Sequence, residues 1–144
     1  MCIRDSNKAH QAFGTVILVD CHSMPSVGVT RDEPKRPDVV IGDRYGTSCA
    51  GELTDATAQC LTRLGYSVSR NKPYAGGFIT EHYGQPARGL HAMQIEVNRC
   101  LYMDERTLEK SGGFPRLAAD LSRLTAELAR YFAAGLLTRP EAAE

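Results

Sequence analysis

One stretch, TVILVDCHSMPS at residues 15–26, constrains the fold more than any other part of the sequence. Residues 16–19 form an unbroken apolar run, rich in β-branched side chains, which is typical of a strand covered on both faces in a parallel sheet. The run ends at Asp20, and Pro25 prevents the ladder from simply continuing. Catalytic groups in open α/β sheets gather beyond the carboxyl ends of strands. His22 is therefore a candidate metal ligand or base, and a histidine that is only hydrogen-bonded in a turn is the alternative.

The rest of the chain alternates between strand and helix patterns. Two short segments and one clearly alternating segment are typical of strands, and they lie at residues 38–42, 66–70 and 91–98. Apolar residues at helical spacing predict one helix after a capping turn at residues 46–48 and a longer helix that begins at Pro115. One or two helical turns are expected at residues 78–83. This order predicts one α/β domain, a mixed sheet flanked by helices.

Two segments are predicted to carry no chemistry. The first eleven residues show no clear period and are expected to be an irregular start. The long helix has one apolar stripe for the core, and the charged residues beside that stripe are expected to form a solvated surface: Arg116, Asp120, Arg123, Glu127 and Arg130.

The composition excludes several classes of protein. The 144 residues carry 17 basic and 17 acidic side chains, so there is no electrostatic case for binding nucleic acid or an anionic membrane. No apolar run approaches the roughly 20 residues of a membrane span, and the N-terminus lacks the apolar stretch of a signal peptide. The five cysteines are scattered without a C-x-x-C pair, which favours reduced thiols in a cytoplasm over a disulfide framework or zinc ribbon.

Further candidate groups come from the alternating strand and from a loop. Glu96 lies on the polar side of its strand, where such a carboxylate more commonly faces solvent than a cavity. A polar pocket is the alternative, because Gln94 and Asn98 share this side. The glycines of residues 71–77 would let the backbone close around a small ligand, although a plain connecting turn has the same composition. A Cys21 nucleophile is not favoured, because neighbours on an extended chain project in opposite directions.

Four motifs now carry a resemblance to a known family. In chain order they are VDCHSMPS (19–26), GDRYGTS (42–48), NKPYAGGFITEHYG (71–84) and HAMQIEVNRCLYMDE (91–105). Over roughly residues 13–128 the sequence resembles the C-terminal half of the N-formylglutamate amidohydrolase family, whose wider relatives are zinc carboxypeptidase-like hydrolases. The resemblance implies a mixed sheet flanked by helices and zinc-dependent hydrolysis of the small molecule N-formyl-L-glutamate to formate and L-glutamate, a step of histidine degradation in the cytoplasm.

The same resemblance implies roles for particular residues. His22 corresponds to the last zinc ligand of the family, and Glu96 to the catalytic glutamate that acts on the zinc-bound water. The two carboxylates of the substrate need cationic or N–H partners. The residues near matching motifs that are expected to bind them or to shape the pocket are Arg44, Asn71, Tyr74, Gly76, Gly77 and Arg99, with Arg88 as a further available arginine.

The sequence departs from the family in its zinc ligands. A catalytic zinc site needs three protein ligands, and the family supplies two of them from an N-terminal half with no counterpart here. We therefore expect an enzyme fragment with an irregular or artefactual start at residues 1–12, a hydrolase portion at 13–134 and a frayed tail at 135–144. Its sheet would be incomplete towards the N-terminus, with an exposed apolar edge. The alternatives are a related zinc deacylase for another N-acyl amino acid and a non-catalytic, truncated binding module.

Overall fold

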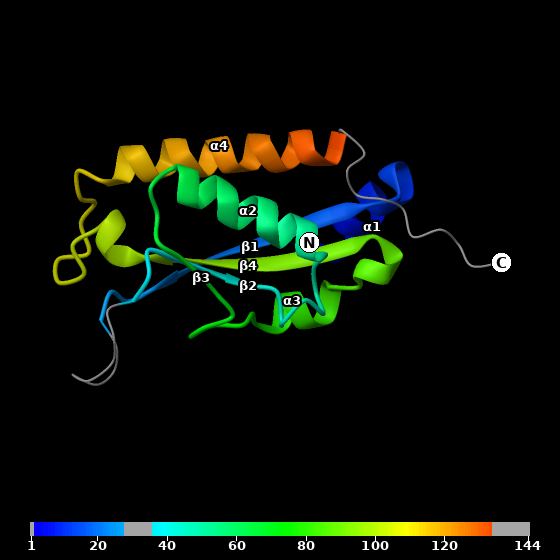
Figure 1. The fold of residues 1–144 in the computed structure, drawn as a ribbon, viewed down its shortest axis with the longest axis horizontal. Coiled ribbons are helices and arrows are strands. Elements are labelled where there is room, and N and C mark those ends of the chain that lie inside the picture. Colours follow the sequence, from blue (N-terminus) through cyan, green and yellow to red (C-terminus); the bar gives the residue numbers. More distant parts are fainter. Residues whose placement is uncertain (1, 28–35, 134–144) are drawn as a thin grey trace.

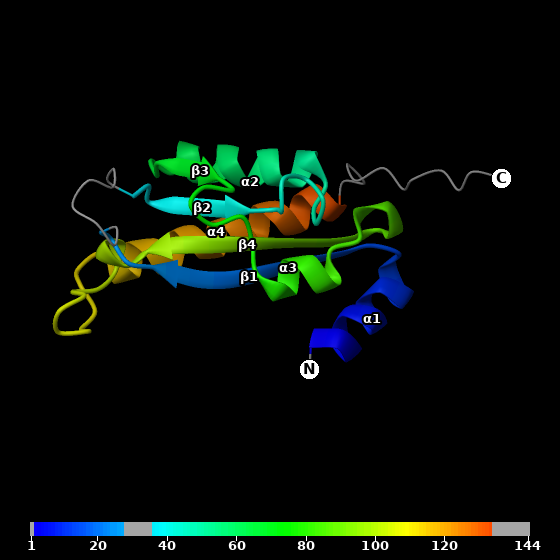
Figure 2. The same cartoon turned by 90° about the horizontal axis from the view of Figure 1, so that it is seen from below.

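The computed structural model of this chain describes residues 2–27 and 36–133. Within them a four-stranded mixed sheet lies between helices (Figures 1 and 2). Strand β4 occupies the centre of the order β1-β4-β2-β3, parallel to β1 and antiparallel to β2, which in turn is parallel to β3. The strands are β1 (Val16–Met24), β2 (Val39–Gly42), β3 (Val68–Arg70) and β4 (Leu90–Asn98). The predicted mixed sheet flanked by helices is confirmed.

Helices cover the two faces of the sheet unequally. The two long helices α2 and α4 lie side by side on one face, whereas the short α3 lies on the opposite face against β4 (Figures 1 and 2). The helices are α1 (Cys2–Phe13), α2 (Gly51–Arg63), α3 (Phe78–Tyr83) and α4 (Phe114–Ala133), with single 3₁₀ turns at Pro86–Arg88 and Arg99–Leu101. None of the helices in the described residues is both long and apolar enough to cross a bilayer.

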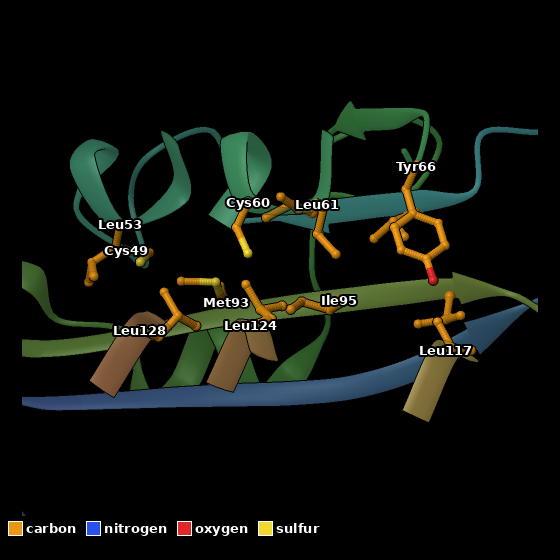
Figure 3. Close-up of a cluster of buried hydrophobic side chains, with 13 residues drawn as sticks. Cys49, Leu53, Cys60, Leu61, Tyr66, Met93, Ile95, Leu117, Leu124 and Leu128 are labelled. Carbon is orange, nitrogen blue, oxygen red and sulfur yellow. The ribbon is translucent and has the colours of Figure 1, made fainter. Parts of the chain in front are cut away.

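The hydrophobic core fills the space between the sheet and the pair α2 and α4 (Figure 3). Met93 and Ile95 point from β4 towards leucines of both helices, and each such fully buried side chain contributes about 1.5–3 kcal/mol. The predicted alternation of β4 is therefore confirmed on its apolar side. The core residues labelled in Figure 3 are Cys49, Leu53, Cys60, Leu61, Tyr66, Met93, Ile95, Leu117, Leu124 and Leu128.

Strand β1 lies at the edge of the sheet, where its only partner among the described strands is β4. Its apolar residues 16–19 are half-buried, so the prediction that both faces of this strand are covered was wrong. One of its faces borders an apolar groove of about 610 Å³ between α1, β1 and α4, lined by residues such as Ile17, Val19 and Leu128. The error arose because an apolar run shows that the side chains are hydrophobic but does not show which other segments cover the strand.

Three local expectations differ from the structure. Helix α1 forms where an irregular start was expected, because apolar residues such as Ala9, Ala12 and Phe13 recur at helical spacing. The turn at residues 46–48 does not cap α2, since the N-cap residue Ala50 makes no side-chain cap bond and the Ser48 hydroxyl donates to the Ala92 carbonyl of β4. Asp120 was expected at a solvated surface but is only 5% exposed. The predicted tail at 135–144 lies outside the described residues, and the domain boundaries stay a prediction.

Candidate active site

Parallel pairing of β1 with β4 brings the two principal candidates together. The register places His22 opposite Glu96, and two residues earlier it places Asp20 opposite Gln94. In-register residues on neighbouring strands point to the same face, so these four side chains lie on the face away from the α2–α4 core. The His22 Nδ1 atom is 3.7 Å from Glu96 Oε1. His22 and Glu96 therefore lie on neighbouring strands with their side chains on one face of the sheet.

Glu96 is buried, with 7% of its surface exposed, so the expectation of a carboxylate facing solvent was wrong. The reason is that β4 is a central strand, covered on this face by α3 and the loop before it. Gln94 is 4% exposed and its Nε2 donates to Glu96 Oε1 at 2.6 Å. A buried carboxylate is costly unless it accepts such bonds. The Gln94 Oε1 atom itself is buried without a hydrogen-bond partner.

Asp20 is a member of the site that the sequence analysis did not assign. Its Oδ2 atom lies 3.1 Å from His22 Nε2, while the His22 side chain is 48% exposed and that of Asp20 is 20% exposed. The signal was present in the sequence, because residues two apart on a strand point to the same side. Asp20 and His22 have that spacing within the motif DCH.

The residues that alternate with this pair face the other way. Cys21 lines the apolar groove beside α4, as expected for a neighbour of His22 on an extended strand. Burial, and secondarily the charge of Asp20, raises the pKa of the Cys21 thiol, which disfavours the reactive thiolate. Ser23 accepts a hydrogen bond from Arg99 Nε at 3.1 Å. Neither Cys21 nor Ser23 therefore forms a nucleophilic dyad with His22.

The loop at residues 71–77 packs directly onto the end of β2. A side chain at Gly42 would place its Cβ 2.5 Å from the Gly76 backbone nitrogen, so only glycine permits this approach. A Cβ at Gly77 would lie 3.2 Å from the unpartnered Gln94 Oε1. The loop therefore reaches the face of the sheet that carries Asp20, His22, Gln94 and Glu96. Asn71 fixes the start of the loop, because its Oδ1 accepts from the Asp43 backbone N–H at 3.1 Å and its Nδ2 donates to Asp43 Oδ1 at 2.7 Å.

The candidate substrate-binding residues lie at different places around this loop. Arg44 is next to Gly76 and forms an ion pair with the exposed Glu81 at 3.5 Å. Tyr74 accepts a hydrogen bond from Arg36, whose guanidinium also stacks over the ring at 5.5 Å. Arg44 thus lies beside Gly76, the neighbour of the glycine that reaches Gln94, whereas the contacts of Tyr74 and Arg99 are with Arg36 and Ser23.

His22 is distinguished from the other histidines by its carboxylate neighbours. The ring of His10 contacts the Arg88 carbonyl, His82 stacks on Phe78, and His91 accepts a hydrogen bond from the Ala50 N–H. An imidazole with a carboxylate on one nitrogen and a second carboxylate near the other fits one ligand position of a zinc site. Among the described residues no group of three or more His, Cys, Asp or Glu side chains is arranged to hold a metal ion.

Known proteins resemble this chain over the region that contains the site. A family profile described as N-formylglutamate amidohydrolase matches residues 4–103. N-formylglutamate deformylase of Pseudomonas aeruginosa is 40% identical over 95 residues, which are 65% of this chain and 36% of that protein. The enzyme of the same name from Pseudomonas putida is 36% identical over 103 residues, 71% of this chain and 39% of that protein. The chain thus spans well under half the length of these curated relatives.

Solved structures share the fold. The crystal structure of N-formylglutamate amidohydrolase from Ralstonia eutropha JMP134 superimposes with a TM-score of 0.87 at 37% identity, over 92% of this chain and 49% of that chain. A bacteriophage poly-gamma-glutamate hydrolase superimposes with a TM-score of 0.51 at 12% identity, over 88% of this chain and 60% of that chain. The second likeness shows a common fold and no more.

Proposed function

Because the chain belongs to the N-formylglutamate amidohydrolase family, we propose that it is part of a zinc-dependent enzyme that hydrolyses the formamide bond of N-formyl-L-glutamate. The products are formate and L-glutamate, in the degradation of histidine in the cytoplasm. The observation that carries this proposal is the in-register pairing of His22 with the buried Glu96 on one face of the sheet. The relatives named as deformylases support the choice of substrate.

In this proposal His22 is one zinc ligand, and the remaining ligands come from outside the described residues. A catalytic zinc ion, when bound, makes water more acidic and polarises a carbonyl group. Glu96 is the general base: it takes a proton from the attacking water and returns it to the departing amide nitrogen. Gln94 supports this role by donating to Glu96 Oε1, which fixes the carboxylate and leaves Oε2 for the proton.

In this proposal the substrate binds beside the loop at residues 71–77. Glutamate carries two carboxylates, which are held best by guanidinium groups and backbone N–H groups. Gly77 is supported by its place beside Gln94, and Gly76 and Arg44 by their contact with each other in the same loop region. Asn71 acts by fixing the loop to Asp43, while Tyr74 and Arg99 are proposed to shape the outer part of the pocket.

A substrate panel tests the proposal. The N-terminal portion of the Pseudomonas aeruginosa relative would be joined to this chain, and formate or acetate release would be measured with zinc content on the same samples. We expect release from N-formyl-L-glutamate and far less turnover of N-acetyl-L-glutamate and N-formyl-L-leucine. Preference for another acyl group would favour a different zinc deacylase. A folded, zinc-loaded chimera without turnover of any substrate would favour the non-catalytic binding module.

A further inference from the structure

We propose that Asp20 is a positioning residue for His22. Its carboxylate holds the neutral imidazole in the tautomer that carries the proton on Nε2, and this leaves the lone pair of Nδ1 on the side of Glu96. This inference rests on the proposed function in one respect: the proposed function explains why a particular tautomer of His22 would be useful. The tautomer itself is a property of this chain without zinc or substrate.

The distances around the imidazole are unequal. His22 Nε2 lies 3.1 Å from Asp20 Oδ2, a close ion-pair contact, whereas Nδ1 lies 3.7 Å from Glu96 Oε1. Asp20 and His22 share a face of β1, and the strand is held by in-register pairing to β4 from Val16 to Met24. The contact is therefore built into a paired strand and does not depend on a loop.

Two carboxylates compete for the single N–H of the neutral ring. An ionised carboxylate only accepts hydrogen bonds, so the nitrogen that faces the stronger acceptor carries the proton. Glu96 is the weaker competitor for two reasons: it is farther away, and its Oε1 already accepts from Gln94 Nε2 at 2.6 Å. Asp20 has 20% of its side chain exposed, less than half the 48% of His22, so water screens the contact only in part.

The tautomer decides which nitrogen can act. A metal ion binds the unprotonated nitrogen, and a carboxylate on the other nitrogen commonly fixes its choice. Without Asp20, the remaining carboxylate beside His22 in the described structure is Glu96, on the Nδ1 side. The proton would then move to Nδ1 and bond to Glu96. One substitution, which replaces neither His22 nor Glu96, would then make both residues unavailable for the proposed chemistry.

The test is the tautomer of His22 in the ¹⁵N-labelled chain, read from two-bond ¹H–¹⁵N correlation spectra at about pH 8, well above the ordinary imidazole pKa of about 6.5. The signals of His22 are those missing from the spectrum of His22→Gln. We expect the Nε2–H form in the wild type. In Asp20→Ala the ratio of Nε2–H to Nδ1–H should fall by roughly tenfold or more, the scale expected for the loss of one carboxylate charge beside Nε2.

Two further variants separate positioning from a general structural effect. Asp20→Asn keeps an oxygen that accepts a hydrogen bond and should retain the Nε2–H form. Asp55→Ala removes an exposed carboxylate on α2 that pairs with Arg70, and it should leave the tautomer unchanged. An Nδ1–H form in the wild type would overturn the proposal without any variant, and so would equal ratios in wild type and a folded Asp20→Ala. Either result stands apart from the outcome of the formate assay.

Discussion

At the scale of single residues, the site is a row of four side chains in which each depends on a neighbour. Asp20 contacts His22, His22 faces Glu96, and Glu96 accepts from Gln94. The strand patterns predicted that Glu96 and Gln94 share a side, because a two-residue alternation is visible in the sequence. They could not predict that Glu96 is buried, since burial depends on α3 and on a loop whose position comes from tertiary packing.

His91 provides a prediction about pH at this scale. Burial lowers its pKa, with a smaller opposing effect of the Glu52 charge, and its Nδ1 accepts the Ala50 N–H at 3.2 Å. The His91 imidazole therefore binds a proton more readily in the unfolded chain than in the folded chain. Stability should be lost as pH falls through the unfolded histidine pKa of about 6.5. The measurement is the urea midpoint of unfolding between about pH 7.5 and 5.5.

The matched comparison is between two histidine variants. His91→Gln should flatten this pH dependence, whereas His82→Gln, which changes an exposed ring on α3, should preserve it. A wild-type midpoint that stays constant across this range would contradict the account, as would an unchanged slope in His91→Gln.

At the scale of elements, the sequence predicted whether a segment is a helix or a strand better than it predicted which segments pack against each other. Strand β4 and helix α3 lie where their patterns indicated, because alternation, glycine and proline are local signals. The burial of Asp120 on α4 was missed, since its partner Tyr66 lies 54 positions away and follows α2. The close approach of Gly76 to Gly42 was invisible for the same reason: a contact between distant segments leaves no local pattern.

The bond between Tyr66 and Asp120 is a testable link between α4 and the segment after α2. The Tyr66 hydroxyl donates to Asp120 Oδ2 at 2.8 Å, and burial together with this bond raises the pKa of Tyr66 to about 12. Tyr66→Phe leaves the buried carboxylate short of one donor. It should lower the free energy of unfolding by about 1–3 kcal/mol, as measured by urea titration.

Tyr131→Phe is the control, because Tyr131 is a half-buried tyrosine on α4, the helix that carries Asp120. We expect a change within about 0.5 kcal/mol for it. Equal effects of the two substitutions would show that the Asp120 bond does not stabilise the fold.

At the scale of the whole molecule, the edge of the sheet and the proposed zinc ligand belong to the same strand. The apolar strand β1 lies at the edge of the described sheet beside an apolar groove, and His22 is carried by that strand. The assignment of His22 as a zinc ligand comes from a family motif and stays a prediction, and a motif does not specify which other segments would supply the remaining ligands. The chain spans 36% and 39% of its two curated relatives.

Metal analysis of this chain alone is the prediction that follows. One imidazole does not hold zinc against water and buffer, because a catalytic site normally uses three protein ligands. We expect weak binding or none at one-to-one stoichiometry after dialysis against trace zinc. Tight one-to-one zinc that is lost in His22→Ala and also in His82→Ala or His91→Ala would show that the ligand set assigned here is wrong.

The central claim is that Glu96 moves the proton while His22 holds the metal, and one paired measurement on the chimera tests it. Formate release from N-formyl-L-glutamate and zinc content would be determined together for Glu96→Gln and His22→Ala. Glu96→Gln keeps the size of the side chain but cannot accept the proton, so turnover should fall by roughly 10²–10⁴-fold with zinc retained. His22→Ala should lose both zinc and turnover. Near wild-type turnover in Glu96→Gln would contradict the account and leave Glu96 as a buried polar residue on a sheet face.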